Sequence, residues 1–130
     1  MRGLAEIVLM VADVQRSLHF YRDVLGLSVI SPSELKGPVF LQVGDAIDGV
    51  PQQIVLVPRP PDAPEPAIDR RHRSLHHLGL IVSSTEFGRE RVRLEGLGMQ
   101  LRTGEHPFLA VQAIYLDDPD GNEVEIVAAK

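Results

Sequence analysis

The sequence predicts an α+β fold built from two tandem βαβββ modules, which combine into a half-open, barrel-like sheet around a concave site. Three observations support this fold class. A strand-like apolar run followed by a helical pattern occurs twice within the 130 residues. The two halves overlay at offsets of 70 to 72 positions, and a proline-rich stretch separates them. One half alone would leave an apolar sheet face uncovered, so we expect the two sheets to combine around a shared concave surface.

The first module spans about residues 1–58. Residues 6–11 have the β-branched composition of a strand, and Asp13 stands where a helix N-cap satisfies free backbone N–H groups. Apolar side chains then recur at helical spacing as far as Gly26, which can end the helix with a positive φ. The module is completed by three short strand-like runs, residues 27–30, 39–43 and 52–57.

The connector, about residues 59–73, reads as an extended segment because prolines crowd its first half. The second module, about residues 74–130, starts with a strand at 77–82. Ser83 and Glu86 then form an S-x-x-E capping box that opens a helix ending at Leu97-Gly98. A later strand closes at Tyr115-Leu116, a DPDGN turn follows, and EVEIVA forms the last strand.

Composition limits the chemistry and the partners. Without cysteine, any metal must be held by His, carboxylate or amide groups. The net charge of −5 argues against a nucleic-acid partner. No apolar run approaches the roughly 20 residues of a membrane helix, and the start of the chain lacks a signal-peptide layout. We therefore expect no nucleic acid or membrane partner and a cytoplasmic location.

Strand alternation predicts which side chains face the concave surface. Glu6 shares a face with Val8 and Met10, and His77 takes the corresponding place in the second module. In the last strand, Glu125 points the same way together with Glu123 and Val127. One imidazole and two carboxylates, those of His77, Glu6 and Glu125, are thus predicted to converge.

Two segments carry a resemblance to a known family. EIVLMVADVQRSLHFYRDVLGL resembles the first-module signature of the vicinal oxygen chelate superfamily of glyoxalase, bleomycin-resistance and extradiol-dioxygenase proteins, and DPDGNEVEI resembles its last-strand signature. The resemblance implies metal ligands at the first strand of each module and at the last strand of one or both. By position, these are Glu6, His77, Val55 and Glu125.

The chain departs from the family pattern at two of these positions. Glu6 stands where His is most common, and Val55 cannot ligate. The expected site therefore has three protein ligands, Glu6, His77 and Glu125, and keeps positions open for water or substrate. The expected cofactor is a divalent ion, Fe(II) or Mn(II) by preference, with Ni, Zn or Mg as further options.

Val55 also bears on the reaction. By the resemblance, glyoxalase I and epimerase members use a carboxylate at about this position to move a carbon-bound proton. Gln53 lies on the same face but cannot abstract a proton, so an isomerase would need Glu6 or Glu123 instead. The first choice is an extradiol-type ring-cleaving dioxygenase acting on a small molecule with vicinal oxygens. Glyoxalase-type lyase or isomerase and thiol transferase activities are the alternatives.

A further class remains open, a metal-free protein that binds a drug or metabolite without turnover, as bleomycin-resistance members do. The family resemblance also implies a homodimer. The sequence leaves open whether modules pair within one chain or across a two-fold axis. Gln53, Val55 and Glu123 are the expected substrate-facing residues.

The stretch EHPFLAVQAIYLDDPDGNEVEI resembles single-domain ring-cleaving members, which implies His106 as an acid–base group and Tyr115 as a donor to bound oxygen. Each assignment has a plainer alternative. Tyr115 would simply pack, Glu125 would pair with an arginine such as Arg102, and Glu6 would be solvated. The remaining interpretations are His76 as a bystander and Asp118 and Asp120 as turn residues that bond backbone amides.

Overall fold

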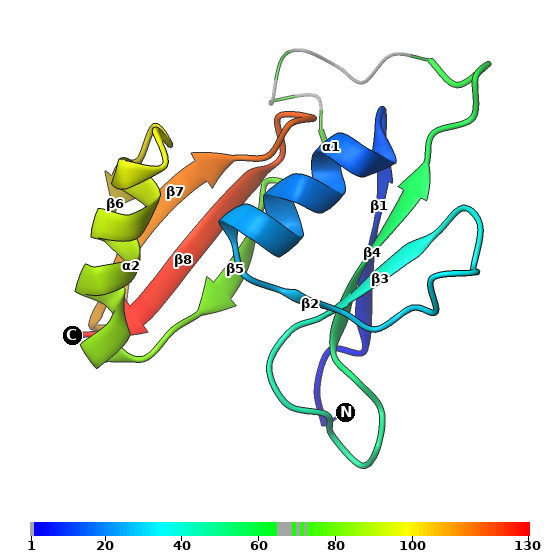
Figure 1. Cartoon of the computed structure of the whole chain (residues 1–130). Coiled ribbons are helices and arrows are strands. Elements are labelled where there is room, and N and C mark those ends of the chain that lie inside the picture. The colour runs from blue at the N-terminus through cyan, green and yellow to red at the C-terminus, as the bar shows by residue number, and fades with distance from the viewer. Residues whose placement is uncertain (1, 65–68, 70, 72) are drawn as a thin grey trace. The chain divides into compact units, whose positions relative to one another are not determined.

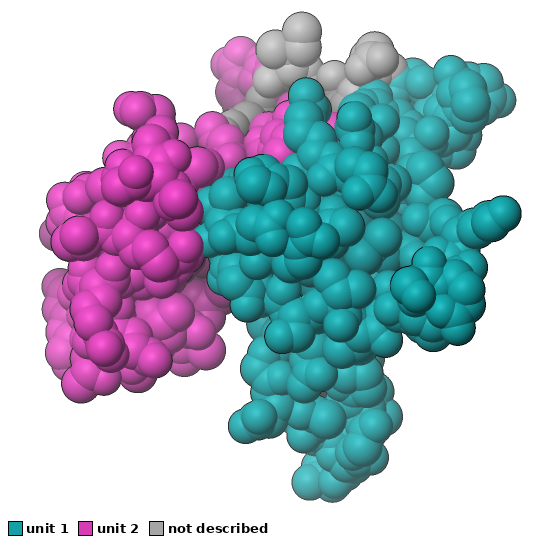
Figure 2. All heavy atoms as spheres, in the orientation of Figure 1, with its two compact units in different colours: residues 1–64 teal, residues 65–130 magenta. Residues whose placement is uncertain are grey.

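The computed structural model describes residues 2–64, 69, 71 and 73–130. The chain divides into two compact units, residues 1–64 and residues 65–130, which Figure 2 distinguishes by colour. Each unit contains one four-stranded sheet and its own helical segment. Among the described residues, none of the helices combines the length and the apolar character needed to cross a bilayer.

The first unit has the order βαβββ. Its sheet runs β1-β4-β3-β2, with β1 parallel to β4 and the other pairs antiparallel. The parallel pairing explains why a helical crossover separates β1 from the rest of the sheet. The strands are β1 (Glu6–Val11), β2 (Ser28–Val29), β3 (Val39–Gln42) and β4 (Gln53–Pro58).

The helical crossover of the first unit begins where the sequence predicts it. Oδ1 of Asp13 accepts hydrogen bonds from the backbone N–H groups of Gln15 and Arg16 at 2.9 and 3.0 Å. The α-helical part, α1 (Val14–Leu18), is short and continues as a π-helical segment, His19–Val24. Gly26 then adopts a φ of 78°, so the predicted glycine at the helix end is confirmed.

The second unit repeats this order, and its sheet runs β5-β8-β7-β6 with β5 parallel to β8. The elements are β5 (His77–Ile81), α2 (Ser84–Gly96), β6 (Arg102–Gly104), β7 (Val111–Asp117) and β8 (Glu123–Ala129). In Figure 1, α2 lies across the strands of this sheet. The Ser83–Glu86 capping box is present at its start. Two tandem βαβββ modules and the α+β class are therefore confirmed.

Burial alternates along β8 and the end of β1 as the sequence predicts, whereas three consecutive residues of β4, Ile54, Val55 and Leu56, are all buried. In β8 the buried side chains are Val124, Ile126 and Ala128, and the residues between them are only partly covered. In β1, Leu9 and Val11 are buried. This alternation places the apolar core on one face of each sheet and leaves the polar residues of β5 and β8 on the other.

The turn between β7 and β8 is organised by Asp118, which is only 4% exposed. Its Oδ1 accepts the backbone N–H groups of Asp120 and Asn122 at 2.9 and 2.8 Å, and its Oδ2 accepts the Asn122 side-chain amide at 2.9 Å. The predicted turn role of Asp118 is confirmed. Arg73 donates a 2.8 Å hydrogen bond to the Gly121 carbonyl, which ties the chain just before β5 to this turn.

Candidate metal centre

The polar face of the second sheet is set by strand register. His77 pairs with Glu123 across β5 and β8, and Tyr115 pairs with Glu125 across β7 and β8. Arg102 of the edge strand β6 pairs with Tyr115. Residues paired in register point to the same side of a sheet, so these side chains share one face. The predicted convergence of His77 and Glu125 within the second unit follows from this register.

His77 and Glu125 form the centre of the polar face. His77 Nε2 lies 3.5 Å from Glu125 Oε2, and their side chains are 35% and 12% exposed. The His77 ring also meets the Tyr115 ring edge to face, with centroids 5.9 Å apart. An imidazole nitrogen and a carboxylate oxygen facing each other in this way are the donor types that suit divalent transition-metal ions.

The Glu125 carboxylate is also held by a phenol. The Tyr115 hydroxyl donates a 2.6 Å hydrogen bond to Glu125 Oε1. This bond, together with partial burial and the negative charges of Glu125 and Glu123, raises the pKa of Tyr115 to about 12. Tyr115 therefore keeps its proton at neutral pH, and its hydroxyl is committed to Glu125.

Glycine makes room for this pair from both neighbouring strands. A Cβ added at Gly79 of β5 would lie 3.0 Å from Glu125 Oε2. A Cβ at Gly104 of β6 would lie 2.6 Å from Tyr115 Cε2. Real Cβ atoms do not approach other heavy atoms as closely as 2.6 Å, so the position of the Tyr115–Glu125 pair depends on both glycines.

Glu123 has a different partner. Arg102 Nη2 donates hydrogen bonds of 2.7 Å to Glu123 Oε2 and 2.7 Å to Asp117 Oδ1. The pKa of the Arg102 guanidinium is raised by these bonds, first by the one to Asp117. The sequence also allows a pairing of Arg102 with Glu125. In the structure Arg102 instead binds Asp117 and Glu123, the two carboxylates next to the turn that joins β7 and β8.

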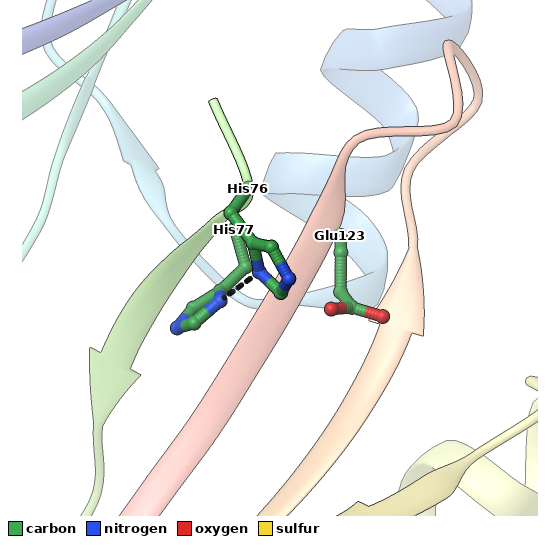
Figure 3. Close-up of side chains that lie close together, drawn as sticks. All are labelled: His76, His77 and Glu123. Carbon is green, nitrogen blue, oxygen red and sulfur yellow. Dashed lines mark hydrogen bonds between the residues drawn. The ribbon is translucent and has the colours of Figure 1, made fainter. Parts of the chain in front are cut away.

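His76 joins this face, although the sequence interpretation leaves it as a bystander. Its Nδ1 lies 2.8 Å from Nδ1 of His77, and the two rings meet edge to face. Donor atoms of His76, His77 and Glu123 all lie within 4.8 Å of one another (Figure 3). Strand alternation assigns neighbouring residues to opposite faces, but His76 precedes β5 and is not bound by that rule.

At the equivalent positions of the first unit, fewer side chains can ligate a metal ion. Glu6 pairs with Gln53 as His77 pairs with Glu123, and Gln53 Nε2 donates a 3.1 Å hydrogen bond to Glu6 Oε2. Val55 occupies the position that Glu125 has in the second unit and is 3% exposed. An amide-bound carboxylate and a buried valine thus stand where the second unit has an imidazole and two acids.

His106, the predicted acid–base group, lies in the segment between β6 and β7. Its Nδ1 accepts the backbone N–H groups of Phe108 and Leu109 at 3.3 and 3.0 Å. An imidazole whose Nδ1 accepts hydrogen bonds carries its proton on Nε2. Nδ1 of His106 therefore holds the backbone of residues 108 and 109, and Nε2 carries the N–H.

Comparisons with known proteins agree with this architecture. A family model described as the Glyoxalase/Bleomycin resistance protein/Dioxygenase superfamily matches residues 3–126. A solved structure of a glyoxalase/dioxygenase from Nostoc punctiforme superposes with a TM-score of 0.74 at 22% identity, covering 99% of this chain and 92% of that one.

Two curated relatives with different activities are similar to the chain. One is a catechol-2,3-dioxygenase from Bacillus subtilis (strain 168), 28% identical over 121 residues, which cover 92% of this chain but only 39% of the dioxygenase. The other is a lactoylglutathione lyase from Salmonella typhimurium, 25% identical over 137 residues, which cover 98% of this chain and 93% of the lyase. The chain spans about two fifths of the length of the first relative and nearly all of the second. Because the family model matches almost the whole sequence, this chain belongs to the Glyoxalase/Bleomycin resistance protein/Dioxygenase superfamily.

Proposed function

We propose that the chain is a divalent-metal-dependent enzyme that binds a small molecule through two adjacent oxygens and cleaves a catechol-type ring with molecular oxygen. Both oxygen atoms enter the ring-opened product, so the reaction needs no external reductant. His77 and Glu125 are the proposed ligands from the second unit, and Glu6 is the proposed third ligand.

The donor set of the second unit fits a divalent ion. Two donor atoms bound about 2.1 Å from one cation lie about 3.0 Å apart at the right angle of an octahedral site and about 3.4 Å apart at a tetrahedral angle. The separation of 3.5 Å between His77 Nε2 and Glu125 Oε2 is close to the tetrahedral value and about 0.5 Å longer than the octahedral one. In the first unit, the hydrogen bond from Gln53 orients the Glu6 carboxylate. Imidazole and carboxylate donors together suit Fe(II) or Mn(II).

Val55 is the observation that carries the choice of reaction. It pairs with Val8 in the first unit as Glu125 pairs with Gly79 in the second, so the two positions correspond. The family resemblance assigns a proton-moving carboxylate to this place in glyoxalase I-type members. A buried valine can neither ligate a metal nor accept a proton, which favours ring cleavage over isomerisation.

The protein's own groups would prepare the site as follows. Tyr115 holds one oxygen of Glu125, so that the other faces His77. His106, with its proton on Nε2, is the proposed acid–base group. When bound, the ion would supply Lewis acidity and a template for two neighbouring substrate oxygens.

Oxygen uptake tests the proposal directly. Protein loaded anaerobically with Fe(II) is mixed with catechol and air, and oxygen consumption is recorded with the absorbance of the ring-opened product. We expect one oxygen per catechol, and little turnover in Glu125→Gln. Protein that binds Fe(II) stoichiometrically yet consumes no oxygen with a panel of catechols contradicts the proposed reaction.

The lyase alternative has its own support in the curated relative named lactoylglutathione lyase, which aligns with almost the full chain. Formation of lactoylglutathione from methylglyoxal and glutathione is the matching assay. Without a carboxylate at Val55, this activity would have to use Glu6 or Glu123 as the base, so either Glu6→Gln or Glu123→Gln would abolish it. Failure to take up metal after reconstitution would favour the metal-free binding class instead.

A further inference from the structure

We infer that the second unit has a cation position of its own, formed by His76, His77 and Glu123, and that Arg102 competes with the cation for Glu123. This position does not rest on the proposed ring cleavage. It shares only His77 with the proposed site, and it uses the opposite nitrogen of that ring.

The geometry of the two imidazoles is the first reason. Their Nδ1 atoms face each other at 2.8 Å, so one proton lies between them (Figure 3). Two nitrogens bound about 2.0 to 2.1 Å from one cation lie about 2.9 Å apart at the right angle of an octahedral site and about 3.4 Å apart at the tetrahedral angle of a zinc site. A cation can therefore replace that proton with small ring movements, since His76 is exposed and His77 is half-buried.

Glu123 supplies the third donor. It pairs with His77 in register, and one of its carboxylate oxygens lies within 4.8 Å of one ring nitrogen of each histidine. Its side chain is 13% exposed, which limits competition from water. Two imidazoles with one carboxylate, and no thiolate anywhere in the chain, form a donor set for Fe(II), Co²⁺, Ni²⁺ or Zn²⁺.

Arg102 lowers the affinity of this position for a cation. Its guanidinium binds Glu123 Oε2 at 2.7 Å, so the carboxylate already has a positively charged partner. The same guanidinium also binds Asp117 at 2.7 and 3.2 Å. When Glu123 turns toward a cation, Arg102 therefore keeps a charged partner. The arginine nevertheless opposes a nearby cation by Coulomb repulsion and by competing for the carboxylate.

His77 is oriented for this role by Glu125. When Nδ1 of His77 meets a cation, Nε2 carries the ring proton and faces Glu125 Oε2 at 3.5 Å. A ligating histidine usually donates its other N–H to such an acceptor, which fixes the ring. Glu125 would then be an outer partner held by Tyr115, whereas in the proposed site it is a ligand.

Calorimetric titration of the full chain with Zn²⁺ tests the position. We expect His76→Ala and Glu123→Gln each to weaken binding by more than the roughly 10- to 100-fold that loss of an outer partner costs. Arg102→Gln should tighten binding, and Arg102→Lys, which keeps the charge, should stay closer to the parent. The exposed-histidine control His19→Ala should bind as the parent does.

Nitrogen-15 NMR of the histidine rings gives a second readout on folded protein. With Zn²⁺ bound, the inference requires metal-shifted Nδ1 signals for His76 and His77. A shifted Nε2 of His77, with parent-like binding in His76→Ala and Glu123→Gln, overturns the inference and leaves the proposed site intact. Unchanged or weaker binding in Arg102→Gln overturns the competition with Arg102. Absence of Zn²⁺ binding by the parent overturns the cation position, whereas the ring-cleavage proposal is judged separately by oxygen uptake with Fe(II).

Discussion

The Tyr115 hydroxyl lies 2.6 Å from Glu125 Oε1, directly across the β7–β8 pair, and donates its proton to that oxygen. The bond leaves Glu125 Oε2 facing His77 Nε2. The sequence interpretation gives Tyr115 a role toward bound oxygen, but in this structure its partner is a protein carboxylate. Tyr115 thus holds Glu125 Oε1 in this structure, and its role toward bound oxygen stays a prediction.

Replacing Tyr115 with Phe should loosen Glu125 while preserving the ring. We expect metal affinity to fall about 10-fold, within the range found for outer partners of metal ligands. The free energy of unfolding should fall by about 1 to 2 kcal/mol, because a hydrogen bond to a charged acceptor is lost. Calorimetry and urea denaturation measure the two effects. Unchanged metal affinity in Tyr115→Phe would show that the phenol does not position Glu125.

The raised pKa of Tyr115 predicts a specific alkaline behaviour. The pKa is about 12 in the folded chain against 10.0 for free tyrosine, so folding is favoured while the phenol is protonated. This contribution is complete below pH 10 and is lost as pH rises toward 12. The chain has two tyrosines and no tryptophan, so tyrosinate absorbance can resolve the transition, and its loss in Tyr115→Phe assigns it. In Glu125→Gln the transition should move down toward pH 10, and an unmoved transition would contradict the assignment to the carboxylate.

Gly79→Ala should disturb the site without removing any donor. The new Cβ would lie 3.0 Å from Glu125 Oε2, so the carboxylate must shift by a few tenths of an ångström. We expect weaker metal binding in calorimetry with little change in stability. Gly88→Ala in α2 is the matched control, because nothing lies within 4 Å of its Cβ. The control should bind metal normally and gain about 0.5 to 1 kcal/mol of stability from helix propensity. Equal metal affinity in the two variants would rule out a spatial role for Gly79.

Asp118→Ala should destabilise the second unit. Asp118 is buried and accepts two backbone N–H groups and one side-chain amide, all of which lose their partner. The expected cost is about 1 to 3 kcal/mol in urea denaturation. Asp118→Asn keeps an acceptor at Oδ1 but turns an N–H toward the Asn122 amide, so it should cost less than Ala. A neutral Asp118→Ala would mean that Asp118 does not organise the turn.

The sequence was sufficient to predict the βαβββ order, because local signals mark its boundaries. Asp13 and the Ser83–Glu86 box start the helical segments, and Gly26 and Gly98 end them with positive φ. Within the first helix, the apolar spacing predicts one continuous element, whereas the structure changes to a π-helix at His19. Apolar periodicity reports which face is buried and does not distinguish one hydrogen-bond pattern from another.

The site was predictable only where strand alternation applies. Register places His77, Glu123 and Glu125 on one face, as the repeat implies. The position of His76 was not predictable, because it lies one residue before the regular strand. The choice of Arg102 between Glu123 and Glu125 depends on the pairing of β6 with β7, and the sequence carries no distinct signal for so short an edge strand.

The hydrogen bond from Arg73 to the Gly121 carbonyl fixes a point in the chain three residues ahead of His76. His76 lies between this anchored point and the first residue of β5, whereas His77 is held by the β5–β8 ladder. We therefore expect that inserting one residue between Arg73 and His76 would displace the first ring more than the second. Segment length at this point can thus change the donor set of the face while every strand residue remains the same.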